Sequence, residues 1–168
     1  MRWMWIDRIV EHIPEKRLVA IKNVSLAEEH LHDHFPAAEG ADALPVMPAP
    51  LIIEGMAQTA GILVGAACDF KEKVILAKIS GATFEREVFP GSTIRYEATL
   101  DRIDPQGAAT SGIVSVANSD TTDWELLASI ALMFSHVDQN MSGLAFPEEN
   151  FVFGDNLNVL LRAAGMRI

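Results

Sequence analysis

The chain has 168 residues, enough for one sizeable hydrophobic core and short for two. Hydrophobic residues make up 49% and charged residues 21%, a composition typical of a folded domain, which excludes intrinsic disorder. The formal net charge of −10 excludes a nucleic-acid surface, because phosphate binding needs a basic footprint. The single cysteine, Cys68, excludes an intramolecular disulfide, and charges within residues 1–8 argue against a signal peptide. We therefore expect a cytoplasmic protein.

The predicted elements begin with a short amphipathic turn at residues 6–12. Alternation of apolar and polar residues predicts a strand at 17–26, and an irregular stretch rich in Ala, Pro and acidic residues follows at 27–50. A long apolar helix is predicted from about Pro50 or Leu51 to Cys68. Proline favours the first helical positions and disfavours helical geometry in the residue before it, so Ala49 is expected to lie just outside the helix.

The apolar helix has the length of a membrane span, but its composition argues against one. It contains Glu54 and Gln58, and a carboxylate inside hydrocarbon is costly, so a buried helix is predicted and no membrane span. Ala57, Gly61 and Gly65 recur at every fourth position, and each helical glycine costs about 1 kcal/mol relative to alanine. We expect this cost where a sheet wraps closely around the helix; a small-residue helix in an α/β layer is the alternative.

After the helix, alternation with period two predicts strands at 74–80, 83–89, 93–104, 108–117 and 124–137. Pro90-Gly91 and residues 105–107 supply turns. One apolar helix followed by antiparallel strands indicates an α+β fold, with the helix lying on the sheet. Residues 1–138 are predicted to form this domain. Residues 139–168 form a C-terminal extension, with a helix near 155–165 that Asp155 caps and that we expect to pack on a neighbouring subunit.

Three features near the helix start could carry chemistry. Glu54 and Gln58 are four residues apart and share a helix face, where Gln58 could orient the Glu54 carboxyl group as a proton donor or water ligand. His34 is the other acid–base candidate. The Ala49 N–H at the helix N-terminus could bind a developing oxyanion. A hydrogen-bonded buried glutamate and a structural loop histidine are the alternatives.

The motifs HFP at 34–36, PVMP at 45–48, LIIEGMAQ at 51–58 and FEREVFPG at 84–91 together resemble a known family. That family is the 3-hydroxyacyl-acyl-carrier-protein dehydratases of type II fatty-acid synthesis. The resemblance implies the hotdog fold, in which a long central helix is wrapped by an antiparallel β-sheet. It also implies a homodimer or a trimer of dimers, with active sites at the subunit interface.

The resemblance further implies a reaction and a role for each site residue. A (3R)-hydroxyacyl thioester, carried by acyl carrier protein or coenzyme A, would lose water to give a trans-2-enoyl thioester. His34 would be the base, Glu54 its partner from the other subunit, and Ala49 the donor to the thioester carbonyl. Phe84 and Phe89 are candidates for the wall of the acyl tunnel. No metal and no cofactor are implied.

The sequence departs from the family pattern beside the proposed site. Ala37 and Ala49 replace glycines, and if the second glycine needs a positive φ, Ala49 would be strained. The connection 37–44 (AAEGADAL) is longer than usual, and it could reshape the entry to the site.

Three rival interpretations remain open at this stage. His30, His32 and His34 alternate along the chain as metal ligands can, but no further ligand cluster follows apart from the isolated His136. An acyl thioesterase of the same fold would use a carboxylate at the place of Glu54. A hotdog domain that binds acyl chains without turnover is the third.

Overall fold

The structure is a computed structural model, which describes residues 3–118, 123–137 and 154–166. A single antiparallel sheet holds the strands β1 (Arg8–Ile13), β2 (Arg17–Asn23), β3 (Val74–Phe84), β4 (Ser92–Asp104), β5 (Gly107–Asn118) and β6 (Glu125–His136). Their order across the sheet is β1-β2-β4-β5-β6-β3, so β3 lies at an edge next to β6. The helices are α1 (Glu29–Asp33), α2 (Ala49–Ala67) and α4 (Asp155–Ala163).

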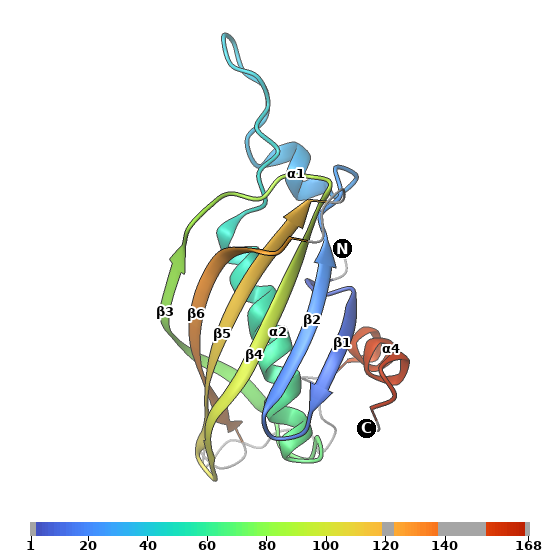
Figure 1. Ribbon diagram of the computed structural model, residues 1–168, viewed down its shortest axis with the longest axis vertical. Helices are drawn as coiled ribbons and strands as arrows, with labels where there is room; N and C mark the ends of the chain where they lie inside the picture. The colour runs from blue at the N-terminus through green and yellow to red at the C-terminus, as the bar shows by residue number, and fades with distance from the viewer. Residues whose placement is uncertain (1–2, 119–122, 138–153, 167–168) are drawn as a thin grey trace.

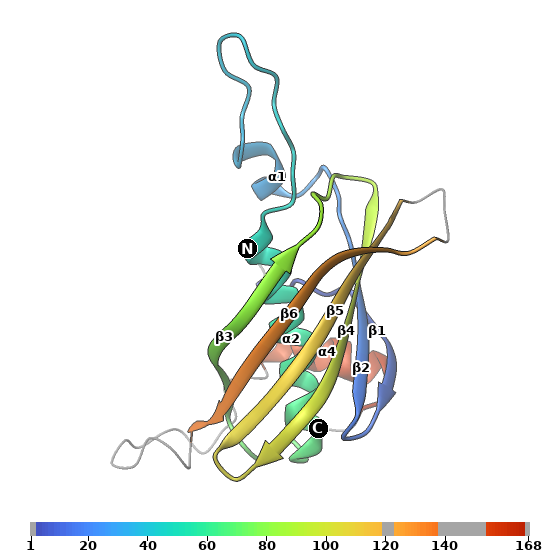
Figure 2. The same cartoon turned by 60° about the vertical axis from the view of Figure 1, so that its left-hand side comes forward.

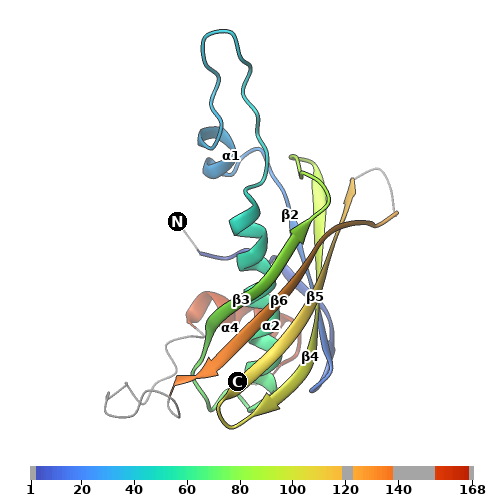
Figure 3. The same ribbon diagram turned by 90° about the vertical axis from the view of Figure 1, so that its left-hand side faces the viewer.

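Helix α2 lies along one face of the curved sheet, and the sheet bends around it (Figures 1 and 3). The core forms between them, where the sheet-facing residues of α2 pack against alternate residues of β2, β4, β5 and β6. This arrangement confirms the predicted hotdog fold: one long apolar helix can bury its face only against the apolar face of the sheet.

Two strand predictions need correction. Residues 8–13 form strand β1 and not a turn; the bulge between Ile9 and Glu11 interrupts the alternation by which the sequence would reveal a strand. Residues 74–84 form one strand, β3, where two were predicted. Irregularities between Leu76 and Lys78 and between Ile79 and Gly81 shift the register without turning the chain.

The stretch predicted to be irregular contains the short helix α1, which is too brief to show a helical period in the sequence. After α1, residues 34–44 are exposed and extend away from the sheet (Figure 2), whereas residues 46–48, just before α2, are buried. A bridge between Ala38 and Ala41, and a bond from the Leu44 N–H to the Phe35 carbonyl, hold this projecting loop together.

Helix α2 begins at Ala49, so Ala49 lies inside the helix and not before it. Pro48 is the N-cap residue, with φ −62° and ψ 130°, and Pro50 occupies the second helical position. The residue before a proline disfavours helical geometry but can adopt it. Neither Ala37 nor Ala49 has a positive φ, so the two replacements of glycine by alanine strain neither position.

The close approach between helix and sheet occurs at a glycine that the spacing pattern did not single out. A Cβ on Gly55 would lie 2.4 Å from the ring carbon Cζ and from the hydroxyl of Tyr96, which is fully buried on β4. A Cβ on Gly61 would meet Phe134 at an ordinary 3.6 Å. The small residues Ala57 and Gly61 instead line the groove described below.

The C-terminal helix α4 packs on β1 of its own chain through the buried Leu160 and Leu161 (Figure 1). Gly154 is its N-cap and Asp155 its first residue, so Asp155 does not cap the helix as predicted. Gly165, with φ 72°, follows the helix end. Most of the segment joining β6 to α4 lies outside the described residues, and the domain boundary at 138 stays a prediction.

By length and composition, α2 could cross a membrane. However, 56% of its most apolar window is buried inside the molecule, where its side chains form part of the core.

Candidate active site

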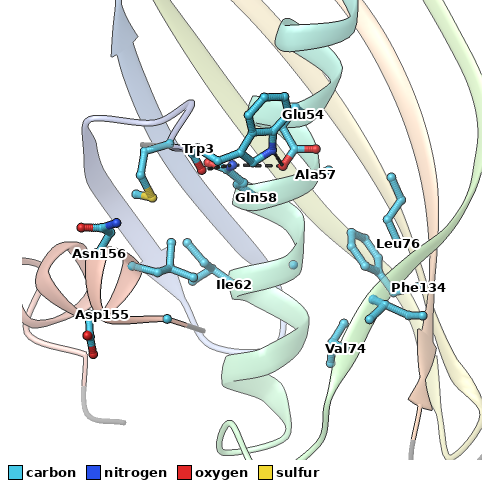
Figure 4. Close-up of a pocket in the computed structure, with 15 residues that line it drawn as sticks. Trp3, Glu54, Ala57, Gln58, Ile62, Val74, Leu76, Phe134, Asp155 and Asn156 are labelled. Carbon is cyan, nitrogen blue, oxygen red and sulfur yellow. Dashed lines mark hydrogen bonds between the residues drawn. The ribbon is translucent and has the colours of Figure 1, made fainter. Parts of the chain in front are cut away.

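A groove of about 440 Å³ lies along the face of α2 that the sheet leaves uncovered. The side chains of Glu54, Ala57, Gln58 and Ile62 form its floor (Figure 4). The other walls come from the N-terminal segment, strand β3, Phe134 and the start of α4, and their residues are Trp3, Met4, Val74, Ile75, Leu76, Gly154, Asp155, Asn156 and Leu157. Besides the polar side chains Glu54, Gln58, Asp155 and Asn156, the lining of the groove is mostly apolar, as is typical of a small-molecule site.

The Glu54 carboxyl group is held in this groove by two N–H donors. The Gln58 side chain donates from Nε2 to Glu54 Oε1 at 3.0 Å, as the four-residue spacing predicted. The Trp3 indole donates to the same oxygen at 3.1 Å. Within the part of the chain that the structure describes, both hydrogen bonds go to Oε1 and Oε2 accepts none.

Gln58 is itself fixed by the backbone of the N-terminal segment. Its Oε1 accepts the Trp5 N–H at 2.9 Å, and its Nε2 also donates to the Trp3 carbonyl at 3.1 Å. These bonds assign the orientation of the amide, because only one orientation satisfies all the partners. Gln58 therefore connects Glu54 to the N-terminal segment.

Ala49 presents an exposed N–H at the first position of α2. The helix N-terminus leaves such donors unpaired, and this N–H has no acceptor among the described residues. The helix dipole adds a partial positive charge at the same place. Ala49 lies at the N-terminal end of the helix that carries Glu54, and its role as a donor to an oxyanion stays a prediction.

His34 ends α1, where its N–H donates to the His30 carbonyl at 3.2 Å. Its ring is exposed and lies 4.2 Å from the ring of Phe35. His34 does not line the groove that holds Glu54 in the same chain. One chain alone thus keeps the two acid–base candidates apart.

Two predicted tunnel residues also lie outside this groove. Phe84 ends β3 and packs partly against the core, and Phe89 is 41% exposed in the connection to β4. Residues that sequence reasoning missed, above all Trp3, Leu76 and Phe134, line it instead. No sequence spacing signals them, because they come from separate elements that only the fold brings together.

The edge strand β3 borders the groove, and most of its residues are exposed. Residues 75–83 are all exposed, and they include the large apolar residues Ile75, Leu76 and Ile79. A long apolar edge strand exposes unpaired backbone groups and invites pairing with another strand.

Comparison with solved structures first gives the fold class. A thioesterase family protein from Silicibacter pomeroyi matches with a TM-score of 0.59 at 11% identity, over 76% of this chain and 82% of that one. At such low identity the likeness shows only the fold, which is the hotdog fold.

Sequence comparison then gives the family. The model of the FabA-like domain matches residues 2–123. The chain is 36% identical to the 3-hydroxyacyl-[acyl-carrier-protein] dehydratase FabZ of Bacillus pumilus over 76% of this chain and 85% of that protein. It is 37% identical to the FabZ of Geobacter metallireducens, over 77% and 84%. The chain therefore belongs to the FabA-like family of dehydratases, and the resemblance read from its motifs is confirmed.

Proposed function

We propose that the protein removes water from (3R)-hydroxyacyl thioesters to give trans-2-enoyl thioesters, as a hydro-lyase of fatty-acid biosynthesis. The observation that carries this proposal is the Glu54 carboxyl group, fixed through one oxygen and open through the other, in an apolar groove. Family membership supports the same reaction.

In the proposed mechanism, His34 takes the C2 proton of the substrate as general base. The electron pair moves toward the thioester carbonyl, whose oxygen the Ala49 N–H binds at the helix N-terminus. The C2–C3 double bond then forms as the C3–O bond breaks. Glu54 delivers a proton to the departing hydroxyl, directly or through a water, and the proton on His34 restores Glu54. Phe84 and Phe89 lie outside the groove of the single chain, and they are proposed to line the acyl tunnel once two copies pair.

The site is proposed to form between two copies of the chain. His34 does not enter the groove of its own Glu54, and β3 is an exposed apolar edge beside that groove. Antiparallel pairing of β3 with the β3 of a second copy would extend the sheet and cover the groove. The projecting loop 34–44, which begins with His34, would then reach toward the partner. We propose a homodimer, with a trimer of dimers as its larger form.

We further propose acyl carrier protein as the substrate carrier, as the names of the FabZ relatives indicate, with coenzyme A as the alternative carrier. Cytoplasmic location and residues 139–168 as an extension of the family domain belong to the same proposal.

The first test follows enoyl thioester absorbance and free thiol together. Loss or gain of the enoyl signal without thiol indicates dehydration or hydration, whereas thiol release would indicate a thioesterase and contradict the proposal. His34→Ala is expected to abolish the reaction, and Glu54→Gln to lower it severely, in proteins that still fold. Full activity in either variant would remove that residue from the mechanism.

The second test mixes the two inactive variants after subunit dissociation, or produces them together. A dimer of one His34→Ala chain and one Glu54→Gln chain contains one intact site and one doubly altered site. Random pairing makes half of the dimers mixed, so about a quarter of the wild-type activity should return. A mixture that stays inactive, although tagged chains show that mixed dimers form, would place both residues of a site on one chain.

A further inference from the structure

The N-terminal segment crosses the uncovered face of α2 at the level of Glu54 and Gln58 (Figure 4). Trp3 and Glu54 are 51 residues apart in the sequence, and Trp5 and Gln58 are 53 apart. The segment contacts α2 through the Trp3 indole N–H, the Trp3 carbonyl and the Trp5 backbone N–H. We call residues 3–5 the strap.

Residues following Trp3 hold the strap in place. Trp5 is 4% exposed and packs edge-to-face against His30 of α1, with ring centroids 5.0 Å apart. Ile6 is buried, and the Asp7 N–H donates to the Ile21 carbonyl at 2.7 Å. The Trp3 ring in turn lies 5.6 Å from the Trp5 ring, edge to face. The Trp3 indole is therefore held by its contact with the buried Trp5 ring, although Trp3 is 60% exposed.

Both donors on Glu54 point to the same oxygen, and this restricts the carboxyl group. One bond would leave rotation about the terminal torsion nearly free, because that torsion has a broad energy profile. Two donors, one from the next helical turn and one from the strap, fix the plane of the group and direct Oε2 away from both. A carboxyl group that must deliver a proton to one substrate atom benefits from such preorganisation.

We propose that Trp3 is a positioning residue for the dehydration reaction, whose indole N–H holds Glu54 with Oε2 presented to the substrate. Trp3 acts through Glu54 and transfers no proton itself. This inference rests on the proposed role of Glu54. Trp3 thus adds a positioning residue from the N-terminal segment to a site whose other proposed residues come mainly from the HFP and Glu-x-x-x-Gln motifs.

The test compares Trp3→Phe with Trp124→Phe. Phenylalanine at position 3 keeps an aromatic ring on Trp5 and removes the N–H. Trp124 is a second partly exposed tryptophan, 42% exposed, whose ring lies under Arg95 and outside the groove. We expect Trp3→Phe to lower kcat about tenfold with little change in KM, the size that loss of one hydrogen bond to the carboxyl group gives. Trp124→Phe should leave both constants unchanged.

An isostere separates the N–H from the bulk of the ring. Benzothienylalanine at position 3, introduced by semisynthesis, replaces the indole N–H by sulfur and keeps the bicyclic shape. It should lose kcat as Trp3→Phe does. Wild-type kcat in this variant, or in Trp3→Phe, would overturn the inference.

A double variant shows whether Trp3 acts through Glu54. In the Glu54→Gln background, Trp3→Phe should cost less than twofold, because the group it positions is already altered. A further tenfold loss there would show a general structural effect and overturn the inference. High activity in Glu54→Gln alone would instead refute the proposed function, so the two failures are distinguishable.

Discussion

The contact between Gly55 and Tyr96 predicts a large effect from the smallest side chain. In Gly55→Ala the new methyl would lie 2.4 Å from two atoms of Tyr96, whereas carbon atoms in contact are about 3.5–4.0 Å apart. The ring cannot withdraw, because Tyr96 is fully buried. Overpacking of this kind costs up to about 3 kcal/mol, and the better helix propensity of alanine returns about 1 kcal/mol.

Gly55→Ala should therefore lower the free energy of unfolding by about 2 kcal/mol, which corresponds to a Tm about 4–8 °C lower. Gly61→Ala is the matched control on the same helix. Its methyl would meet Phe134 at 3.6 Å, so only the propensity gain of about 1 kcal/mol should remain. Both variants should be unfolded in urea and by heat at one protein concentration, because subunit association shifts apparent stability. A Gly55→Ala protein as stable as Gly61→Ala would refute the packing argument.

Two further predictions concern buried polar groups. The Tyr96 hydroxyl has no partner among the described residues, so Tyr96→Phe should raise the free energy of unfolding by about 1 kcal/mol in urea, and a loss of similar size would reveal a missing hydrogen bond. Burial lowers the pKa of His30 and of His12. Below about pH 6.5, the ordinary pKa of histidine, these side chains bind protons in the unfolded chain more readily than in the folded one. The free energy of unfolding should therefore be highest above about pH 6.5 and decline as the pH falls through that value. His30→Phe should reduce this decline in urea unfolding followed from pH 8 to 5, and an unchanged slope would contradict the assignment to His30.

The sequence determined the elements whose signal is local. The apolar run of α2, the alternation in β2, β4, β5 and β6, and the shared face of Glu54 and Gln58 could all be predicted, because helix and strand periods repeat within a few residues. The HFP and Glu-x-x-x-Gln motifs predicted the family for the same reason: each is a short pattern of residues.

Tertiary structure decided what depends on contacts between distant residues. The bulge in β1 hides that strand from the period, and only pairing with β6 shows that the two strands predicted at 74–80 and 83–89 form one strand, β3, over residues 74–84. The placement of β3 at the sheet edge, beside the open face of α2, follows from strand order, which no local pattern encodes. The second donor on Glu54 comes from Trp3, 51 residues away, and the end of the groove comes from α4. Such contacts depend on how whole elements pack, and packing is a property of the complete chain.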